Sequence, residues 1–400
     1  MKRDRWGIKS SATVGSAART RWWGLASRRE TLLIAAIVVL VAPAAIQCTL
    51  DGSDASNGAA DSEAVALPRT GQTESYKAGD DGDLQMGVSW PAPRFAENPD
   101  NTVTDGLTGL VWAQTANSPG PDVCGTIGQK MAWSEALDHV ACLNAEAYLG
   151  FDDWRLPTRN ELLSLINFAA VNVSTWLNTQ QFVDVQTEGY WSSTTSGANY
   201  EEAWFMNMHF CFMMTRNKTD FDFWVFPVRL GLAGLVNLPR TGQTDSYAAG
   251  DDGDLQMGVL WPVPRFAQNS DNTVTDTLTG LIWTQDANSP GPVACANTAE
   301  EMTWTEALDH VACLNAETYL GFDDWRLPNA YELASLFHAG MDNSADWLTD
   351  EGFANVYASR YWTSTTYGPK SPDDTAWIVE GRGLMQGVDK RHDGRVWPVR

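Results

Sequence analysis

The chain has 400 residues, which is enough for two domains of ordinary size. It is 44% hydrophobic and contains 19 Trp, a composition that excludes a disordered protein. Its formal net charge of -23 repels the phosphate backbone, so the composition also excludes the chain as a whole from the nucleic-acid-binding proteins.

The N-terminal segment, residues 1–48, has the pattern of an export signal. Its first 29 residues carry eight Lys and Arg, and an uncharged apolar run of 15 residues follows, from Leu32 to Ile46. A membrane span needs about 20 residues, so this basic-then-apolar pattern favours export, with Arg28-Arg29 resembling a twin-arginine signal. Lipid attachment at Cys48 and an uncleaved anchor are two alternatives. All three place the rest of the chain outside the cytoplasm, touching the membrane only through this segment.

Residues 49–67 are small, polar and acidic, which predicts a flexible tether. The remaining sequence repeats itself at a constant offset of 171 residues, as between Trp112 and Trp283. Residues 68–229 and 239–400 are therefore two tandem copies of one domain, because solenoid repeats are far shorter than this period. The copies diverge after Trp191 and Trp362.

Each copy mixes strand and helix patterns. Residues 101–112 predict a hairpin, and residues 190–195 and 223–226 predict late strands. Apolar residues at helical spacing predict a first helix from Trp133, and Thr158 with Glu161 predicts the capped start of a second. In copy 2, Thr303 with Glu306 predicts a cap for the first helix as well, and Asn329 with Glu332 repeats the capped start of the second. We therefore expect an α+β fold with two helices and short antiparallel strands in each copy.

The cysteines indicate an oxidising compartment. Two pairs have the same separation of 18 residues: Cys124 with Cys142, and Cys295 with Cys313. We predict a disulfide within each pair. Paired zinc ligands are the alternative, which no close CxxC or HxxxH pattern supports. Cys211 has no counterpart in copy 2, and its aromatic neighbours favour a buried thiol.

An acidic turn, Ala-Gly-Asp-Asp-Gly-Asp, occurs once in each copy. Calcium prefers several hard oxygen ligands on a turn, so calcium is the cofactor that the sequence suggests. The alternative is a solvated acidic turn without metal. The candidate ligands are Asp80, Asp81 and Asp83, with Asp251, Asp252 and Asp254.

Residues that could bind a ligand are concentrated in the divergent segments. Copy 1 offers an aromatic segment with Trp204 and Arg216, and copy 2 offers a basic cluster that suits an anionic glycan. The alternative is a core strand in copy 1 and a solvated hairpin in copy 2. We expect structural roles for residues 153–155 and for His139 and His310, since no nucleophile is recognisably paired with either histidine. The basic candidates are Lys370, Arg382, Lys390, Arg391 and Arg395.

Four segments of copy 1 resemble the Lcl C-terminal domain family, the adhesive end of collagen-like surface adhesins. They are residues 102–105, 108–112, 153–162 and 190–194, and copy 2 repeats them. The resemblance implies a C-type-lectin-like fold, export and, for some members, binding to sulfated or other anionic polysaccharides. This chain has no Gly-X-Y stretch, so trimerisation through a collagen-like stalk does not carry over.

A wider similarity connects the Arg-Leu-Pro-Thr run to formylglycine-generating enzymes. Those enzymes need a reactive cysteine pair and a C-terminal Gly-Ser-Trp run, and both are missing from the two copies. The sequence therefore predicts a non-enzymatic tandem module that recognises a polysaccharide or another cell-surface ligand. A structural envelope protein without a small ligand is the main alternative, and an enzyme on the shared scaffold is the weaker one.

Overall fold

The computed structural model describes residues 64–296, 298–368 and 374–400. The export segment, almost all of the tether and Lys370 lie outside these residues. No helix in the described part of the chain is long and apolar enough to cross a membrane.

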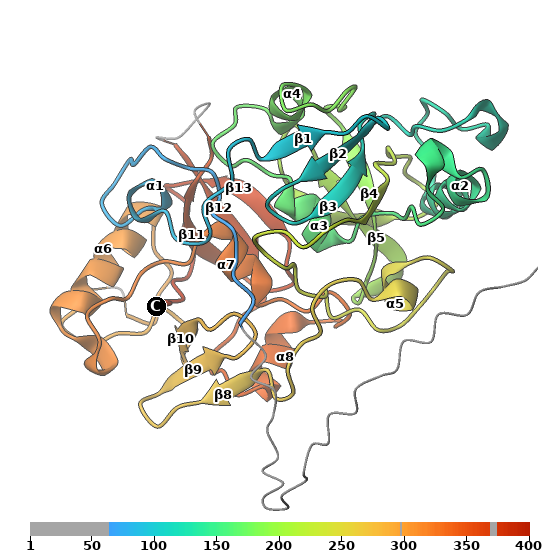
Figure 1. The fold of residues 1–400 in the computed structure, drawn as a ribbon. Helices are drawn as coiled ribbons and strands as arrows, with labels where there is room; N and C mark the ends of the chain where they lie inside the picture. Colours follow the sequence, from blue (N-terminus) through green and yellow to red (C-terminus); the bar gives the residue numbers. More distant parts are fainter. Residues whose placement is uncertain (1–63, 297, 369–373) are drawn as a thin grey trace, which may run out of the picture. The chain divides into compact units, whose positions relative to one another are not determined.

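Both copies are built from short helices and antiparallel strands, which confirms the α+β expectation (Figure 1). The expected number of two helices per copy is wrong: the described residues of each copy form four α-helices, because the acidic turn and the segment after the second expected helix each form a short helix. The predicted hairpin forms from β2 and β3, and the capping pairs at Thr158, Thr303 and Asn329 begin helices as expected. The elements of copy 1 are α1 (Asp81–Leu84), β1 (Phe95–Glu97), β2 (Thr102–Asp105), β3 (Leu110–Ala113), α2 (Trp133–Ala145), α3 (Arg159–Ser164), α4 (Val173–Asn178), β4 (Gly189–Ser196), β5 (Asn199–Asn207), β6 (Met213–Asn217) and β7 (Val228–Leu230). Those of copy 2 are α5 (Asp252–Leu255), β8 (Phe266–Gln268), β9 (Thr273–Asp276), β10 (Ile282–Thr284), α6 (Trp304–Ala316), α7 (Ala330–Ser335), α8 (Ser344–Asp350), β11 (Arg360–Thr366), β12 (Thr375–Glu380) and β13 (Met385–Asp389). Short 3-10 turns lie at Asp122–Cys124, Tyr148–Gly150 and Tyr319–Gly321.

The prediction of a strand at residues 223–226 is wrong. Phe223 and Trp224 form only isolated bridges, to Met131 and Tyr190, and β7 begins after Pro227. This segment crosses from one sheet to the other, so its backbone groups pair with loops. Val225, for example, accepts from the Ser118 N–H at 3.0 Å.

Three sheets organise the two copies. Copy 1 has a sheet in the order β1-β2-β3-β7, and copy 2 has β10-β9-β8. The third sheet, β11-β12-β13-β6-β5-β4, runs through both copies and is joined at its centre where Met385 of β13 pairs with Met213 of β6. One hydrophobic core likewise contains buried residues from both copies, and each copy keeps a smaller core beneath its longest helix. The described residues of the two copies belong to one compact unit rather than two.

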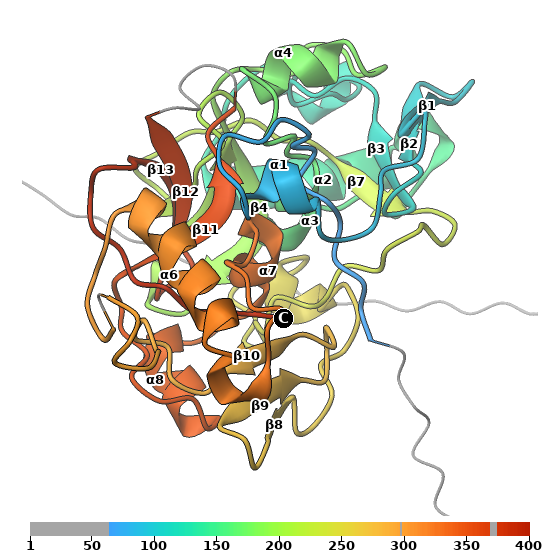
Figure 2. The ribbon, with the colours of Figure 1, turned by 90° about the vertical axis from the view of Figure 1, so that its left-hand side faces the viewer.

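The N-terminal part of each copy packs against the other copy. We call residues 68–88 arm 1 and residues 239–259 arm 2; the ends of each arm are joined by a bridge, Pro68 to Val88 and Pro239 to Val259. In Figure 1 and Figure 2 the blue α1 of arm 1 lies beside orange and red elements of copy 2, in agreement with its contacts to β11, and α5 of arm 2 contacts β4 of copy 1. The two copies therefore exchange their arms.

Glutamine side chains hold the base of each arm. The Gln72 carboxamide accepts from the Thr366 N–H at 3.0 Å and donates to the Thr366 carbonyl. Gln243 donates to the Thr195 carbonyl at 3.2 Å. Gly82 makes arm 1 compact, because a Cβ at this position would collide with the carbonyl of Glu74. The arms thus satisfy backbone groups of β11 and β4 that would otherwise face solvent.

The predicted disulfides are confirmed: Cys124 bonds Cys142 and Cys295 bonds Cys313, with Cα–Cα distances of 5.8 and 5.7 Å. Each ties the loop before the longest helix of its copy to that helix. Cys211 is a buried free thiol, as its sequence neighbours indicated. Disulfides persist in oxidising compartments, so they indicate an extracytoplasmic protein.

The arm exchange predicts that copy 1 needs arm 2. A fragment of residues 64–238 exposes the Thr194 hydroxyl and the Thr195 carbonyl of β4 to water, whereas residues 64–260 supply their partners in arm 2. We expect the longer fragment to be more stable by on the order of 3 kcal/mol, since a hydrogen bond contributes about 1 kcal/mol and one to a charged group about 1.5–3 kcal/mol. Urea unfolding followed by tryptophan fluorescence measures this difference. Asp252→Ala with Gln243→Ala in the longer fragment is the control and should cancel the gain; equal stability of the two fragments would contradict the exchange.

The disulfides predict a second stability effect. Replacing Cys124 and Cys142 together by Ser should lower the free energy of unfolding by about 3 kcal/mol, because an 18-residue loop is no longer closed in the unfolded chain. Denaturant unfolding with and without a reductant measures this. The reductant should destabilise the wild type and leave a variant without both disulfides unchanged; an unaffected wild type would contradict the prediction.

Candidate functional site

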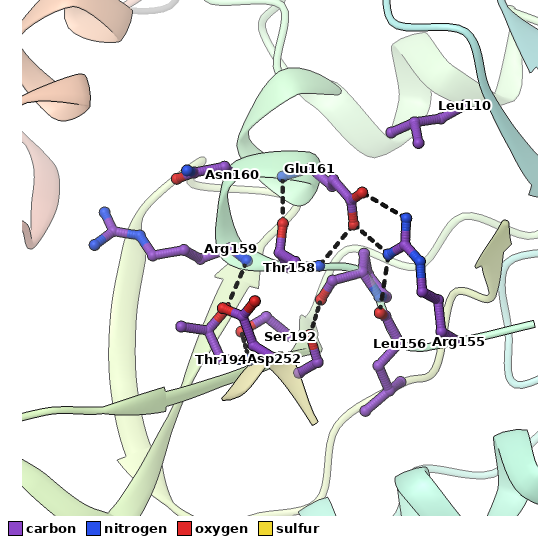
Figure 3. Close-up of polar contacts among 12 residues, drawn as sticks. Leu110, Arg155, Leu156, Thr158, Arg159, Asn160, Glu161, Ser192, Thr194 and Asp252 are labelled. Atoms are coloured by element: carbon purple, nitrogen blue, oxygen red, sulfur yellow. Dashed lines mark hydrogen bonds and ion pairs between the residues drawn. The ribbon is translucent and has the colours of Figure 1, made fainter. Parts of the chain in front are cut away.

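The segment from Trp154 to Glu161 forms a buried corner at the start of α3 (Figure 3). The Arg155 guanidinium donates to both oxygens of Glu161, at 2.5 and 2.6 Å, and Glu161 also accepts from the Thr158 N–H at 2.8 Å. The Trp154 indole donates to the Tyr148 carbonyl at 2.8 Å and is buried. All these groups have internal partners, so the corner positions α3. Glu161 also lines a surface groove, as does Arg326, the copy 2 equivalent of Arg155.

Arm 2 reaches copy 1 directly beside this corner, and we call this junction seam 2. Asp252 of the arm accepts from the Thr194 hydroxyl of β4 at 2.7 Å and from Thr241 of its own arm at 2.6 Å. Figure 3 shows Asp252 with Thr194 below Arg159, whose N–H donates to Thr194 at 3.0 Å. The Arg159 guanidinium lies 3.9 Å from the Trp204 ring centre and donates to the Gly383 carbonyl at 2.9 Å. Arg159 therefore links copy 1 to copy 2 from inside the shared core.

Seam 1, where arm 1 meets copy 2, has the same construction. Asp81 accepts from Thr365 of β11 at 2.8 Å and from Thr70 of its own arm at 2.6 Å. The equivalent of Arg159 is Ala330, so seam 1 lacks a buried guanidinium at that position. Both seams therefore contain a buried aspartate, but only seam 2 has the buried arginine at this position.

Burial dominates the electrostatics of both seams. It raises the pKa of Asp81 and of Asp252 to about 6, although the threonine hydroxyls oppose this by stabilising the ionised form. Burial also lowers the pKa of Arg159 to about 10. Both seam carboxyls thus titrate near neutral pH.

A lysine marks the outer end of each seam. Lys218 donates to Thr195 at 2.8 Å, and its ammonium lies 3.9 Å from the ring centre of Trp133 and 5.1 Å from that of Tyr247 in arm 2. Lys390 is placed in the same way, 3.8 Å from Trp304 and 5.6 Å from Tyr76 of arm 1. Each arm therefore contributes a tyrosine to a cation–π cluster on the other copy.

An open groove accompanies each arm. Groove 1, about 510 Å³, lies between arm 1 and α6; groove 2, about 450 Å³, lies between arm 2 and the β3–β7 side of copy 1. The arms contribute Leu84 and Met86 to groove 1 and the equivalent Leu255 and Met257 to groove 2. Groove 1 is apolar along α6 and ends at polar groups. Those groups are Asn315, Asp324, Arg326 and Arg400.

The acidic turns do not support the calcium hypothesis. Asp80 uses both carboxylate oxygens to accept N–H groups from Tyr76, Lys77 and Asp83. Asp81 points into seam 1. Asp251, Asp252 and Asp254 repeat this arrangement. In the part of the chain that the structure describes, no group of three or more Asp, Glu, His or Cys side chains could hold a metal ion.

The basic candidates of copy 2 do not form one cluster. Lys390 is buried in seam 1, and Arg395 is half-buried, paired with Glu301 at 3.1 Å and placed over Tyr357. Arg391 is exposed but paired with Asp389, at one end of β13, whereas Arg382 lies beyond the other end. The residues are neighbours in sequence, but a β-strand separates them in space.

The two candidates of copy 1 face opposite sides of the sheet. Trp204 is 2% exposed and lies beneath Arg159 in the shared core, so it offers no surface to a ligand. Arg216 lies over the rings of Phe205 and Phe221, on the other face. Of this pair, only Arg216 retains access to solvent.

The histidines and Cys211 have structural partners. His139 contacts the Pro119 carbonyl at 2.9 Å and Thr126 at 2.7 Å, and His310 contacts the carbonyls of Pro290 and Ala296. Burial lowers the pKa of His139 and raises that of the Cys211 thiol to about 12, so this thiol is a poor nucleophile.

Sequence reasoning missed the seams. It treated Asp81 and Asp252 as metal candidates and gave no role to Thr194, Thr365 or the arm glutamines. One signal was available: the segments from residues 67 and 238 differ only at Glu74/Asp245 and Lys77/Ala248. Their near identity did not indicate which copy each arm contacts.

Comparison with known proteins supports the repeat and its family. No curated protein matches the chain. The family model of the Lcl C-terminal domain matches twice, at residues 101–229 and 272–400, and so covers more than half of the chain. Both matches contain the corner and the β-strand that receives an arm. The chain belongs to the Lcl C-terminal domain family, as a tandem pair.

Proposed function

We propose that this chain is an exported adhesin-like module that recognises a carbohydrate or another ligand on a surface. The single observation that carries the proposal is a groove at both arm seams of a double Lcl C-terminal unit. The two disulfides support export, and the net charge of -23 argues against nucleic acid as the partner. Each copy is proposed to be a C-type-lectin-like domain.

The chemistry of groove 1 suits a sugar or a similar amphipathic ligand. The exposed side chains of Leu84, Met86 and Ala312 offer an apolar wall, against which the C–H face of a pyranose ring can pack. The rim provides Asp324, half-exposed and paired with Arg400 at 2.7 Å, which can exchange part of this pairing for hydroxyl groups. Apolar walls with a few polar groups are typical of small-ligand sites.

Two grooves in one compact unit favour binding to repetitive surfaces. Each site alone can be weak, because the second engages at a high effective concentration once the first is bound. The arm exchange keeps the two grooves in one folded body, so no flexible linker dilutes this effect. A polysaccharide or a densely decorated cell surface fits this arrangement.

The proposal predicts that charges in the grooves weaken retention on a surface. Leu84→Arg with Leu255→Arg should reduce binding to a panel of immobilised glycans by about tenfold or more, because both apolar walls are lost. Val293→Arg, at a fully exposed position outside both grooves, is the matched control. Equal retention of both variants would contradict the groove assignment. Absence of binding by the wild type on every glycan would favour a structural envelope protein.

The geometry of the acidic turns also predicts that binding is independent of calcium. Because backbone N–H groups occupy the Asp80 and Asp251 carboxylates, EDTA should leave glycan retention within about twofold of the untreated value. The same glycan panel with and without EDTA measures this. Loss of binding on chelation, restored by calcium, would reinstate the acidic turns as a metal site.

A further inference from the structure

Each seam contains one deeply buried carboxylate that joins an arm to the other copy. Asp81 and Asp252 are 2% and 1% exposed, and each accepts two threonine hydroxyls, one from its own arm and one from the receiving strand. When an arm leaves the other copy, its carboxylate returns to water. Arm docking and carboxylate burial are therefore the same event.

Two threonine hydroxyls stabilise each ionised carboxylate, and at seam 2 the Arg159 guanidinium also attracts Asp252, but the loss of water on burial is the largest effect on the pKa of both carboxyls. Asp80 and Glu332 add repulsion at Asp81, as Asp251 and Glu161 do at Asp252. Charged groups also flank the seams on every packed element. At seam 1 these are Asp83, the pairs Arg326–Glu332 and Lys77–Asp309, and Lys390; at seam 2 they are Asp254, the pair Arg155–Glu161, Arg159 and Lys218.

A carboxyl that is buried without an ion-pair partner is more favourable in its protonated form. The pKa of each seam carboxyl rises from 3.8 to about 6 on burial. A raised pKa in the docked state means that docking is strongest below pH 3.8 and weakens as the pH rises through about 6. Above about pH 7 the extra stability that protonation gives to the docked arm is lost completely.

We propose that Asp81 and Asp252 make the docking of the two arms depend on pH, so that the arms hold the other copy more tightly in mildly acidic surroundings than at neutral pH. Because Leu84 and Leu255 line the grooves, the same protonation stabilises both grooves. Only this link to the grooves rests on the proposed function; arm docking itself does not.

Hydrogen exchange of the full chain tests the proposal without any ligand. Protection of backbone amides in residues 72–86 and 243–257 is compared at pH 5.0 and 7.5, after correction for the intrinsic exchange rate. We expect the open state of each arm to be about tenfold more populated at pH 7.5 than at pH 5.0, because docking raises the pKa of the seam carboxyl from 3.8 to about 6. This window lies above the pKa of His338 near arm 2, which burial lowers to about 4, and Lys218, whose pKa burial lowers to about 8, stays mostly protonated across it.

Two sets of variants assign the effect. Asp81→Asn with Asp252→Asn should abolish the pH response of both arms, whereas Asp83→Asn with Asp254→Asn, on the exposed side of the same short helices, should retain it. Thr365→Val with Thr194→Val should enlarge the response, because these hydroxyls stabilise the ionised form. The proposal is overturned if the variant with Asp81→Asn and Asp252→Asn keeps the pH dependence of arm protection. It is also overturned if the wild type shows equal arm protection at both pH values.

Glycan retention at the same two pH values separates this inference from the proposed function. If hydrogen-exchange protection of the arms depends on pH but no glycan binds, the result supports the docking mechanism and contradicts the adhesive role. If a glycan binds but protection of the arms is the same at both pH values, the result supports the adhesive role and contradicts the docking mechanism.

Discussion

The reciprocal seating of arms 1 and 2 is the constraint on which the rest of the molecule depends. Each arm bonds its own copy through one backbone carbonyl, Thr70 to Phe168 and Thr241 to Ala339, but places its buried carboxylate on the other copy. Asp81 and Gln72 bond threonines of β11, and Asp252 and Gln243 do so at β4. The exchange lets two modest cores merge into one shared core around Trp204 and Trp377. It also makes both grooves, since every groove has an arm as one wall.

Polar groups, rather than extra apolar area, specify this pairing. The buried Arg155–Glu161 and Arg326–Glu332 pairs fix the helices that border the seams, and the seam carboxylates accept hydroxyls from both copies. Burying such groups costs free energy unless all partners are in place. An arm in a wrong register would leave several of them unpaired, so the polar network selects one arrangement.

The two halves are similar but not interchangeable. Arg159 of copy 1 is replaced by Ala330, and Phe205 and Arg216 of β5 and β6 have Ile378 and Val388 at the matching places of β12 and β13. A central guanidinium over Trp204 can be accommodated only once where the two halves meet, because a second one would put two buried cations in the same core. The difference between Arg159 and Ala330 is thus a consequence of packing the two copies together.

Local patterns were sufficient for much of this structure. The helix starts at Thr158, Thr303 and Asn329, the first hairpin, the duplication and both disulfides depend on neighbouring residues and regular spacing, which a sequence displays directly. The position of the seams depends instead on contacts as distant as Gln72 and Thr366, between copies whose arms are almost identical in sequence. From the sequence, Asp81 and Asp252 are therefore expected either to bind calcium or to lie on a solvated acidic turn, and Lys390 is expected to belong to a basic cluster. Only the tertiary structure could decide which copy an arm covers, because either copy presents the same local chemistry, and the choice follows from the shared core and the geometry of the connection between them.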